Sequence, residues 1–145
     1  NESCMFVTLF YGLFDPDTGR FSYCNGGHPP PLRISAEGQV STLDVPGGMV
    51  LGIMDDMPYQ PGEVMLEAGD TVLIYSDGVT EAMNHLNEEF GEARLAALFQ
   101  QQPCSSSKEA VERVLAAVHA FAGGSDQSDD ITCVALVYQP RGAIT

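Results

Sequence analysis

The sequence predicts an α+β domain in which helices pack against a layered, mostly antiparallel sheet. Three observations lead to this prediction: strand-like runs joined by short turns come first, two helical segments follow, and one strand returns near the end. Hairpins that precede helices, rather than alternating with them, are typical of α+β domains. The chain has 145 residues, which is the usual length of a single domain.

The first predicted element is a hairpin. Residues 5–14 form a nearly continuous apolar run rich in aromatics, which is typical of a strand covered on both faces. The sequence D-P-D-T-G at residues 15–19 supplies a turn, and residues 20–25 return as the partner strand. A calcium loop of the EF-hand type is the alternative for this acidic turn, but Gly26 stands where that loop needs Glu.

The middle of the chain predicts short strands separated by turns. Glycines and prolines at residues 26–31 break the sheet, because proline donates no backbone hydrogen bond. Residues 44–62 are rich in Gly, Pro and Met without a clean period, and predict a long structured loop. The strands expected around these segments are residues 32–34 and 40–43, which form a second hairpin, then 63–66 and 71–75.

Two helices are predicted next. The first covers residues 91–101, and the second lies between Ser106 and Gly123, where apolar residues recur with the helical period. Ser106 with Glu109 predicts a capping box, and Glu109 with Arg113 an i,i+4 ion pair. Gly123 and the glycine after it end the helix.

Composition excludes several classes of function. The chain has 20 acidic and 6 basic residues, so its net charge of -14 argues against nucleic acid or an anionic membrane as partner. No apolar run approaches the ~20 residues that a membrane span needs. The four cysteines form no C-x-x-C pair, which argues against a zinc knuckle and favours a reducing, cytoplasmic compartment.

The chemistry-bearing feature is a pair of acidic positions at strand ends. The buried-type strand 71–75 runs directly into Ser76-Asp77-Gly78, and Asp129-Asp130 stands just before the last predicted strand, residues 131–138. If these two strands are antiparallel neighbours, the end of one meets the start of the other and the carboxylates converge. Adjacent residues point to opposite faces, so only one of Asp129 and Asp130 can easily point at Asp77.

Converging carboxylates repel one another unless a cation lies between them, and an all-oxygen site favours Mg²⁺ or Mn²⁺ over Zn²⁺. Ser76 and Thr80 are candidates to hydrogen-bond the Asp77 carboxylate or a bound water. Taken singly, however, an Asp-Gly after a strand is a turn and an Asp pair before a strand caps a loop. From the residues alone, the metal site and these structural interpretations both stay open.

Four sequence blocks resemble one family. They are G-D-T-V-L-I-Y-S-D-G-V-T-E-A at residues 69–82 with F-G at 90–91, N-G-G-H-P-P-P-L at 25–32, the strand at 6–12, and D-D-I-T at 129–132. They resemble the SpoIIE/RsbU-like branch of the metal-dependent (type 2C) serine/threonine protein phosphatases, over about residues 5–138. The resemblance implies a layered antiparallel β-sandwich with flanking helices. It also implies two Mn²⁺ or Mg²⁺ ions, whose bridging water attacks a phosphoserine or phosphothreonine.

The resemblance also implies residue roles. Asp77 and Asp129 match metal-binding aspartates, Asp130 takes a lesser part beside them, and Gly78 matches the glycine next to the metals. No catalytic residue beyond the metal ligands is expected. His28 is expected to make a structural hydrogen bond rather than to act as a general acid.

The family's upstream G-D-x-x-G-H-G block, whose aspartate bridges both metals, is not in the sequence. Residues 1–139 are therefore predicted to be the C-terminal portion of an N-terminally incomplete phosphatase domain, with 140–145 as a tail. The fragment is expected to be inactive alone, to bind metal weakly or not at all, and to expose sheet that favours a dimer or a rearranged packing.

The resemblance implies bacterial signalling as the function. The expected substrate is a phosphorylated anti-sigma-factor antagonist, and an upstream sensor or receiver domain is expected to control hydrolysis. The alternative is a non-catalytic pseudo-phosphatase module that binds a signalling partner. A G-D-x-x-G-H-G block in the preceding residues would distinguish the enzyme from the non-catalytic module, since without its aspartate the set of metal ligands is incomplete.

Overall fold

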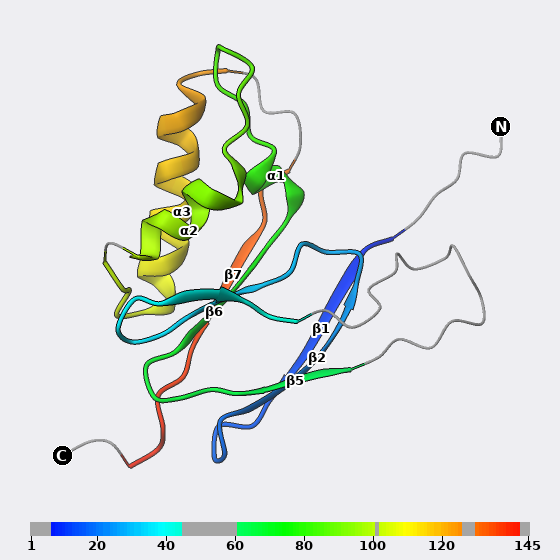
Figure 1. The fold of residues 1–145 in the computed structure, drawn as a ribbon, viewed down its shortest axis with the longest axis vertical. Coiled ribbons are helices and arrows are strands. Elements are labelled where there is room, and N and C mark those ends of the chain that lie inside the picture. Colours follow the sequence, from blue (N-terminus) through cyan, green and yellow to red (C-terminus); the bar gives the residue numbers. More distant parts are fainter. Residues whose placement is uncertain (1–6, 45–60, 101, 126–129, 143–145) are drawn as a thin grey trace, which may run out of the picture.

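Two antiparallel sheets and a layer of helices are stacked on one another (Figure 1). The computed structural model describes residues 7–44, 61–100, 102–125 and 130–142. The outer sheet has the strand order β1 (Leu9–Phe14), β2 (Arg20–Gly26) and β5 (Gly62–Met65). The central sheet has the order β4 (Val40–Thr42), β3 (Leu32–Ile34), β6 (Thr71–Tyr75) and β7 (Cys133–Val137). The predicted α+β sandwich with helices is therefore confirmed.

The predicted first hairpin forms the edge of the outer sheet. β1 pairs antiparallel with β2, and the turn between them ends at Gly19, whose φ of 81° is the left-handed conformation that glycine adopts most easily. The inner face of this sheet carries Phe21 and Tyr23, which are stacked on one another and face the central sheet. These aromatics fill the space between the two sheets.

The prediction that the first strand is covered on both faces is wrong for the described residues. Phe10 and Phe14 pack inward against the core between the sheets, whereas Leu9, Tyr11 and Leu13 alternate with them and are largely exposed. A continuous apolar run shows that both faces of a strand are apolar, but it does not show that another layer covers each face.

The central sheet holds the core on both sides. Along β6, Val72 packs toward the outer sheet while Leu73 and Tyr75 pack toward the helices, which explains the unbroken apolar run in the sequence. β6 and β7 are antiparallel neighbours, with Tyr75 opposite Cys133. The assumed pairing of these two strands is therefore confirmed.

Helices α2 (Gly91–Gln100) and α3 (Ser107–Ala122) cover the central sheet on the side away from the outer sheet (Figure 1). The N-terminus of α3 differs in one respect from the predicted capping box. The hydroxyl of Ser106 accepts from the amide of Glu109 at 3.1 Å, but the carboxylate of Glu109 accepts from the amide of Ser105 and not from that of Ser106. Arg113 pairs with Glu109 at 2.7 Å as predicted, and Gly123 caps the C-terminus with φ 59°.

A one-turn helix, α1 (Asp77–Thr80), directly follows β6 and was not predicted. Most of the predicted loop at 44–62 lies outside the described residues. Within the described segments, no helix has both the length and the apolar character needed to cross a bilayer.

Candidate metal centre

Asp77 stands where β6 ends. The strand is buried up to Tyr75, and the chain then turns at Ser76 into α1, so that Asp77 is the first helical residue and is exposed. A buried strand that ends in an exposed acid delivers a carboxylate to the rim of the sheet. Figure 1 shows α1 at the upper end of β6, far from the turn between β1 and β2 at the bottom of the view.

The segment that leads into β7 reaches the same rim. The backbone of Asp130 lies against Gly78: a Cβ added to Gly78 would come 2.2 Å from the Asp130 carbonyl oxygen and 3.3 Å from the Ile131 amide nitrogen. Gly78 is buried and its φ is not left-handed, so the residue is needed for this close approach rather than for a sharp bend. The two acidic segments are thus in backbone contact at Gly78 and Asp130, and the convergence of their carboxylates stays a prediction.

Asp129 lies outside the described residues, and its side chain is not placed relative to Asp77. Asp130 is described and exposed. Of the three predicted ligands, the structure therefore brings two into one neighbourhood and leaves the third open.

Ser76 and Thr80 do not bond the Asp77 carboxylate among the described contacts. The hydroxyl of Ser76 donates to the carbonyl of Asp130 at 3.1 Å, and that of Thr80 donates to the backbone carbonyl of Asp77 at 3.3 Å. Both hydroxyls therefore bond to backbone carbonyls, where the sequence had suggested a carboxylate or a bound water.

The chemistry of the donors fits a hard divalent cation. Asp77 and Asp130 offer carboxylate oxygens, the ligand type that Mg²⁺ and Mn²⁺ prefer. In the described part of the chain, however, no three His, Cys, Asp or Glu side chains are grouped closely enough to hold a metal. The described residues thus supply part of a coordination sphere.

The rim carries negative potential. Burial first, and then the negative charges of Glu92 and Asp77, together raise the pKa of Tyr75 to about 12. Glu92 lies in the first turn of α2, and the sequence analysis did not single it out. Its approach depends on how α2 packs beside α1, which no local motif encodes.

The G-G-H-P loop at the end of β2 is held by its own residues. Asn25 is buried, and its side chain donates to the carbonyl of His28 at 2.9 Å and accepts from the His28 amide at 2.8 Å. The ring of His28 lies 3.4 Å from the hydroxyl of Thr8. These contacts agree with the structural role predicted for His28.

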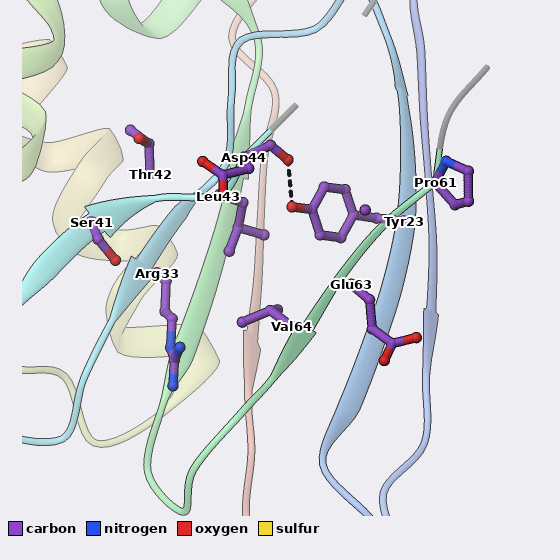
Figure 2. A pocket seen from close by; sticks show the side chains of 10 residues that line it. Tyr23, Arg33, Ser41, Thr42, Leu43, Asp44, Pro61, Glu63 and Val64 are labelled. Carbon is purple, nitrogen blue, oxygen red and sulfur yellow. Dashed lines mark hydrogen bonds between the residues drawn. The ribbon is translucent and has the colours of Figure 1, made fainter. Parts of the chain in front are cut away.

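A separate hollow opens between the two sheets, with a volume of about 340 Å³ (Figure 2). Tyr23 lies in its wall and donates a hydrogen bond to the carbonyl of Asp44, and burial is the main cause that raises the pKa of this tyrosine. Arg33 and Glu63 also line it. None of its lining residues belongs to α1 or to the segment before β7, so this hollow is distinct from the acidic rim.

Solved structures place the fold among bacterial type 2C phosphatase domains. The chain resembles the structure of the SpoIIE phosphatase domain of Bacillus subtilis with a TM-score of 0.72 and 18% identity, covering 92% of this chain and 59% of that one. A structure of the same phosphatase domain with a fragment of its regulatory domain gives a TM-score of 0.76 at 20% identity, covering 91% of this chain and 38% of that one. At these identities the likeness shows the fold alone.

Sequence comparison gives the family. The model of the SpoIIE family, described as Stage II sporulation protein E, matches residues 1–139, and the chain belongs to this family. It is 33% identical over 113 residues to the phosphoserine phosphatase RsbU of Bacillus subtilis (strain 168), covering 78% of this chain. It is 32% identical over 135 residues to the protein IcfG of Synechocystis sp., covering 93% of this chain. The chain spans 33% of the length of RsbU and 21% of that of IcfG.

Proposed function

We propose that the chain is part of a metal-dependent phosphoprotein phosphatase domain that hydrolyses phosphoserine or phosphothreonine. The observation that carries the proposal is the antiparallel pairing of β6 with β7, which brings the backbone of Asp130 against Gly78, next to Asp77. Membership of the SpoIIE family and the likeness to RsbU, which is named a phosphoserine phosphatase, support it.

In this proposal Asp77, Asp129 and Asp130 hold Mn²⁺ or Mg²⁺, and no further side chain of the chain acts on the substrate. When bound, such a cation supplies the Lewis acidity that activates a water and neutralises charge on a phosphoryl group. Asp77 offers an exposed carboxylate on a backbone anchored by β6, and Gly78 lets the second acidic segment approach. The intact domain is proposed to hold two ions, and this chain alone to bind them weakly or not at all.

The proposed substrate is a phosphorylated protein of the anti-sigma-factor antagonist type, and the proposed regulator is an upstream sensor or receiver domain. Support comes from the RsbU relative and from the fold likeness to a structure of the RsbU and RsbW domains of a Mycobacterium tuberculosis protein. Residues 1–139 are proposed as the phosphatase portion and 140–145 as a tail. The cytoplasm is the proposed compartment, because the free thiols of Cys24, Cys104 and Cys133 fit a reducing environment.

Hydrolysis of p-nitrophenyl phosphate by the full-length protein, with and without Mn²⁺, tests the proposal. Asp77→Asn is expected to lower the Mn²⁺-dependent kcat/KM by at least about 100-fold, because outer-shell changes at metal sites already cost 10–100-fold. Asp17→Asn is the matched control: it makes the same chemical change at an exposed acid in the turn between β1 and β2, away from α1 (Figure 1).

Full activity of Asp77→Asn would remove Asp77 from the mechanism. If the unmodified full-length protein hydrolyses no substrate with or without Mn²⁺ but still binds a partner, the non-catalytic module is favoured instead. Release of inorganic phosphate from phosphoserine and phosphotyrosine peptides, measured with the same proteins, separates the proposed substrate class from its nearest alternative.

A further inference from the structure

Ser76 joins β6 to the segment before β7 by three hydrogen bonds. Its amide donates to the carbonyl of Thr132 at 2.9 Å, its hydroxyl donates to the carbonyl of Asp130 at 3.1 Å, and the same hydroxyl accepts from the amide of Thr132 at 3.0 Å. One side chain therefore bonds to two backbone groups on a segment more than fifty positions away.

The hydroxyl takes the place of a backbone carbonyl in the ladder. In an antiparallel hydrogen-bonded pair, the two residues exchange two N–H···O bonds through their backbones. Here the Ser76 amide makes the first, but the Ser76 carbonyl instead accepts from the amide of Val79 in the first turn of α1, at 3.0 Å. The Thr132 amide donates to the Ser76 hydroxyl in place of the Ser76 carbonyl. β6 can therefore end, and α1 begin, at Ser76 while the chain stays hydrogen-bonded to the segment before β7.

Ser76 is also the N-cap residue of α1, yet its side chain makes no capping bond to that helix. A serine at this position normally accepts from an amide of its own helix. The hydroxyl bonds instead to the neighbouring segment. The Asp130 carbonyl that accepts this bond also lies 2.2 Å from the point where a Cβ on Gly78 would stand. The backbone of Asp130 is thus fixed from two directions.

We propose that Ser76 is a positioning residue: its hydroxyl sets the spacing between the backbones of Asp77 and Asp130, and so prepares their carboxylates for a divalent cation. The role rests on the proposed function, since it concerns the same site. Ser76 is not a ligand in this scheme. It acts through the backbone of Asp130 and Thr132, to both of which its hydroxyl bonds.

A matched pair of variants tests this role in the full-length protein. Ser76→Thr and Ser76→Val have nearly the same shape and differ in the hydroxyl, so a defect shared by both reports on volume and a defect of Val alone reports on the hydroxyl. Ser41→Val makes the same change at an exposed serine of β4 and serves as the surface control.

Two readouts separate structure from function. Without metal, hydrogen exchange of the Thr132 amide is expected to be about fivefold faster in Ser76→Val, which corresponds to about 1 kcal/mol for a lost hydrogen bond, and unchanged in Ser76→Thr. Calorimetric titration with Mn²⁺ is expected to show a 10–100-fold weaker Kd for Ser76→Val, the range of outer-shell changes at metal sites, and an affinity close to that of the unmodified protein for Ser76→Thr.

The outcomes are distinguishable. Faster exchange in Ser76→Val with unchanged Mn²⁺ affinity would reduce the hydroxyl to a structural bond and overturn the positioning role while leaving the proposed function intact. Equal losses of affinity in the Thr and Val variants would also overturn it. An unmodified full-length protein that binds no Mn²⁺ would overturn the proposed function, and this role with it.

Discussion

The carbonyl oxygen of Asp130 lies only 2.2 Å from the point that a Cβ on Gly78 would occupy. A side chain at residue 78 cannot fit there, because real Cβ atoms do not come this close to another heavy atom and the obstacle is backbone rather than a flexible side chain. The two segments that carry the acidic residues are therefore in contact only because residue 78 has no side chain.

Gly78→Ala is predicted to force these segments apart. The expected cost is about 2–3 kcal/mol of the free energy of unfolding, the upper part of the range of about 1–3 kcal/mol for overpacking, because the obstacle is backbone. Weaker binding of Mn²⁺ by the full-length protein is expected with it. Gly123→Ala is the contrasting control: its φ is 59° and a Cβ would meet nothing within 4 Å, so it carries only a conformational penalty of about 1 kcal/mol. Urea unfolding of both variants checks the order of the two losses. A Gly78→Ala protein as stable as Gly123→Ala would contradict the crowding.

An ion pair between buried Asp70 and partly buried Arg33 connects β3 to the turn before β6. Asp70 is 1% exposed, and its carboxylate accepts from Nε and Nη2 of Arg33 at 2.9 and 2.6 Å and from the amide of Glu67 at 2.9 Å. Removing the charge of one partner leaves the other partly buried without compensation. The geometry therefore predicts a large effect for a substitution that barely changes shape.

Asp70→Asn is expected to lower the free energy of unfolding by about 3 kcal/mol, seen as a lower urea midpoint with unchanged slope. Glu112→Gln is the control, since the pair between Lys108 and Glu112 is 3.7 Å long, its side chains are 83% and 65% exposed, and such pairs contribute less than about 1 kcal/mol. Similar midpoints for the two variants would mean that the pair with Arg33 contributes no more than a surface pair.

The pairing of β6 with β7 was predictable because each strand has a clear pattern in its own residues. An apolar run that stops at Ser76, and another that starts after Asp130, leave few other partners once both must be buried. The capped start of α3 was predictable for the same reason, since the amide of Glu109 needs an acceptor within its own turn.

Long-range choices were not predictable from local pattern. The turn at 67–70 joins two strands of different sheets, because β5 pairs with β2 while β6 pairs with β3 and β7. The hydroxyl of Ser76 bonds to Asp130 only because the register of β6 and β7 aligns them. Neither fact can be predicted from the residues next to it. Whether the outward face of β1 is exposed likewise depends on long-range packing, which the apolar run in β1 does not encode.

Alkaline pH is predicted to destabilise the protein through the half-buried thiol of Cys133. Burial raises the pKa of Cys133 from 9.0 to about 11. Between these values the unfolded chain has lost the thiol proton while the folded chain keeps it, so the folded state binds more protons and stability falls as pH rises. The contribution is complete below about pH 9 and is lost progressively toward about pH 11.

Cys133→Ala should therefore flatten the fall in stability between pH 9 and pH 11, even though its stability at neutral pH is lower because of the lost packing. Cys24→Ala, the same change on β2, is the control and should keep the steep fall. Urea midpoints at half-unit pH steps give the comparison. Parallel curves for Cys133→Ala and the unmodified protein would show that the thiol does not titrate in this window.

The outer face of the outer sheet predicts self-association of this chain. Leu9, Tyr11, Leu13 and Met65 are 52%, 60%, 62% and 52% exposed. They share one face, since Tyr11 pairs with Cys24, Leu13 with Ser22, and Met65 with Arg20 in successive registers. Leu9, Tyr11 and Leu13 form a row of exposed apolar side chains along β1, whereas Arg20, Ser22 and Glu63 make the rest of this face partly polar. β1 also offers an unpaired edge among the described strands, where a second copy could pair.

The net charge of -14 opposes association, so salt should strengthen it by screening the repulsion between copies. Sedimentation velocity of residues 1–145 is expected to show a dimer or larger species that grows with protein concentration and with ionic strength. Leu13→Glu should shift the distribution toward monomer, whereas Leu86→Glu, at a leucine 65% exposed in the loop between α1 and α2, should not. If the unmodified chain sediments as a compact monomer at high concentration and high salt, the exposed face does not drive pairing, and these side chains are tolerated in water singly, as isolated surface leucines are.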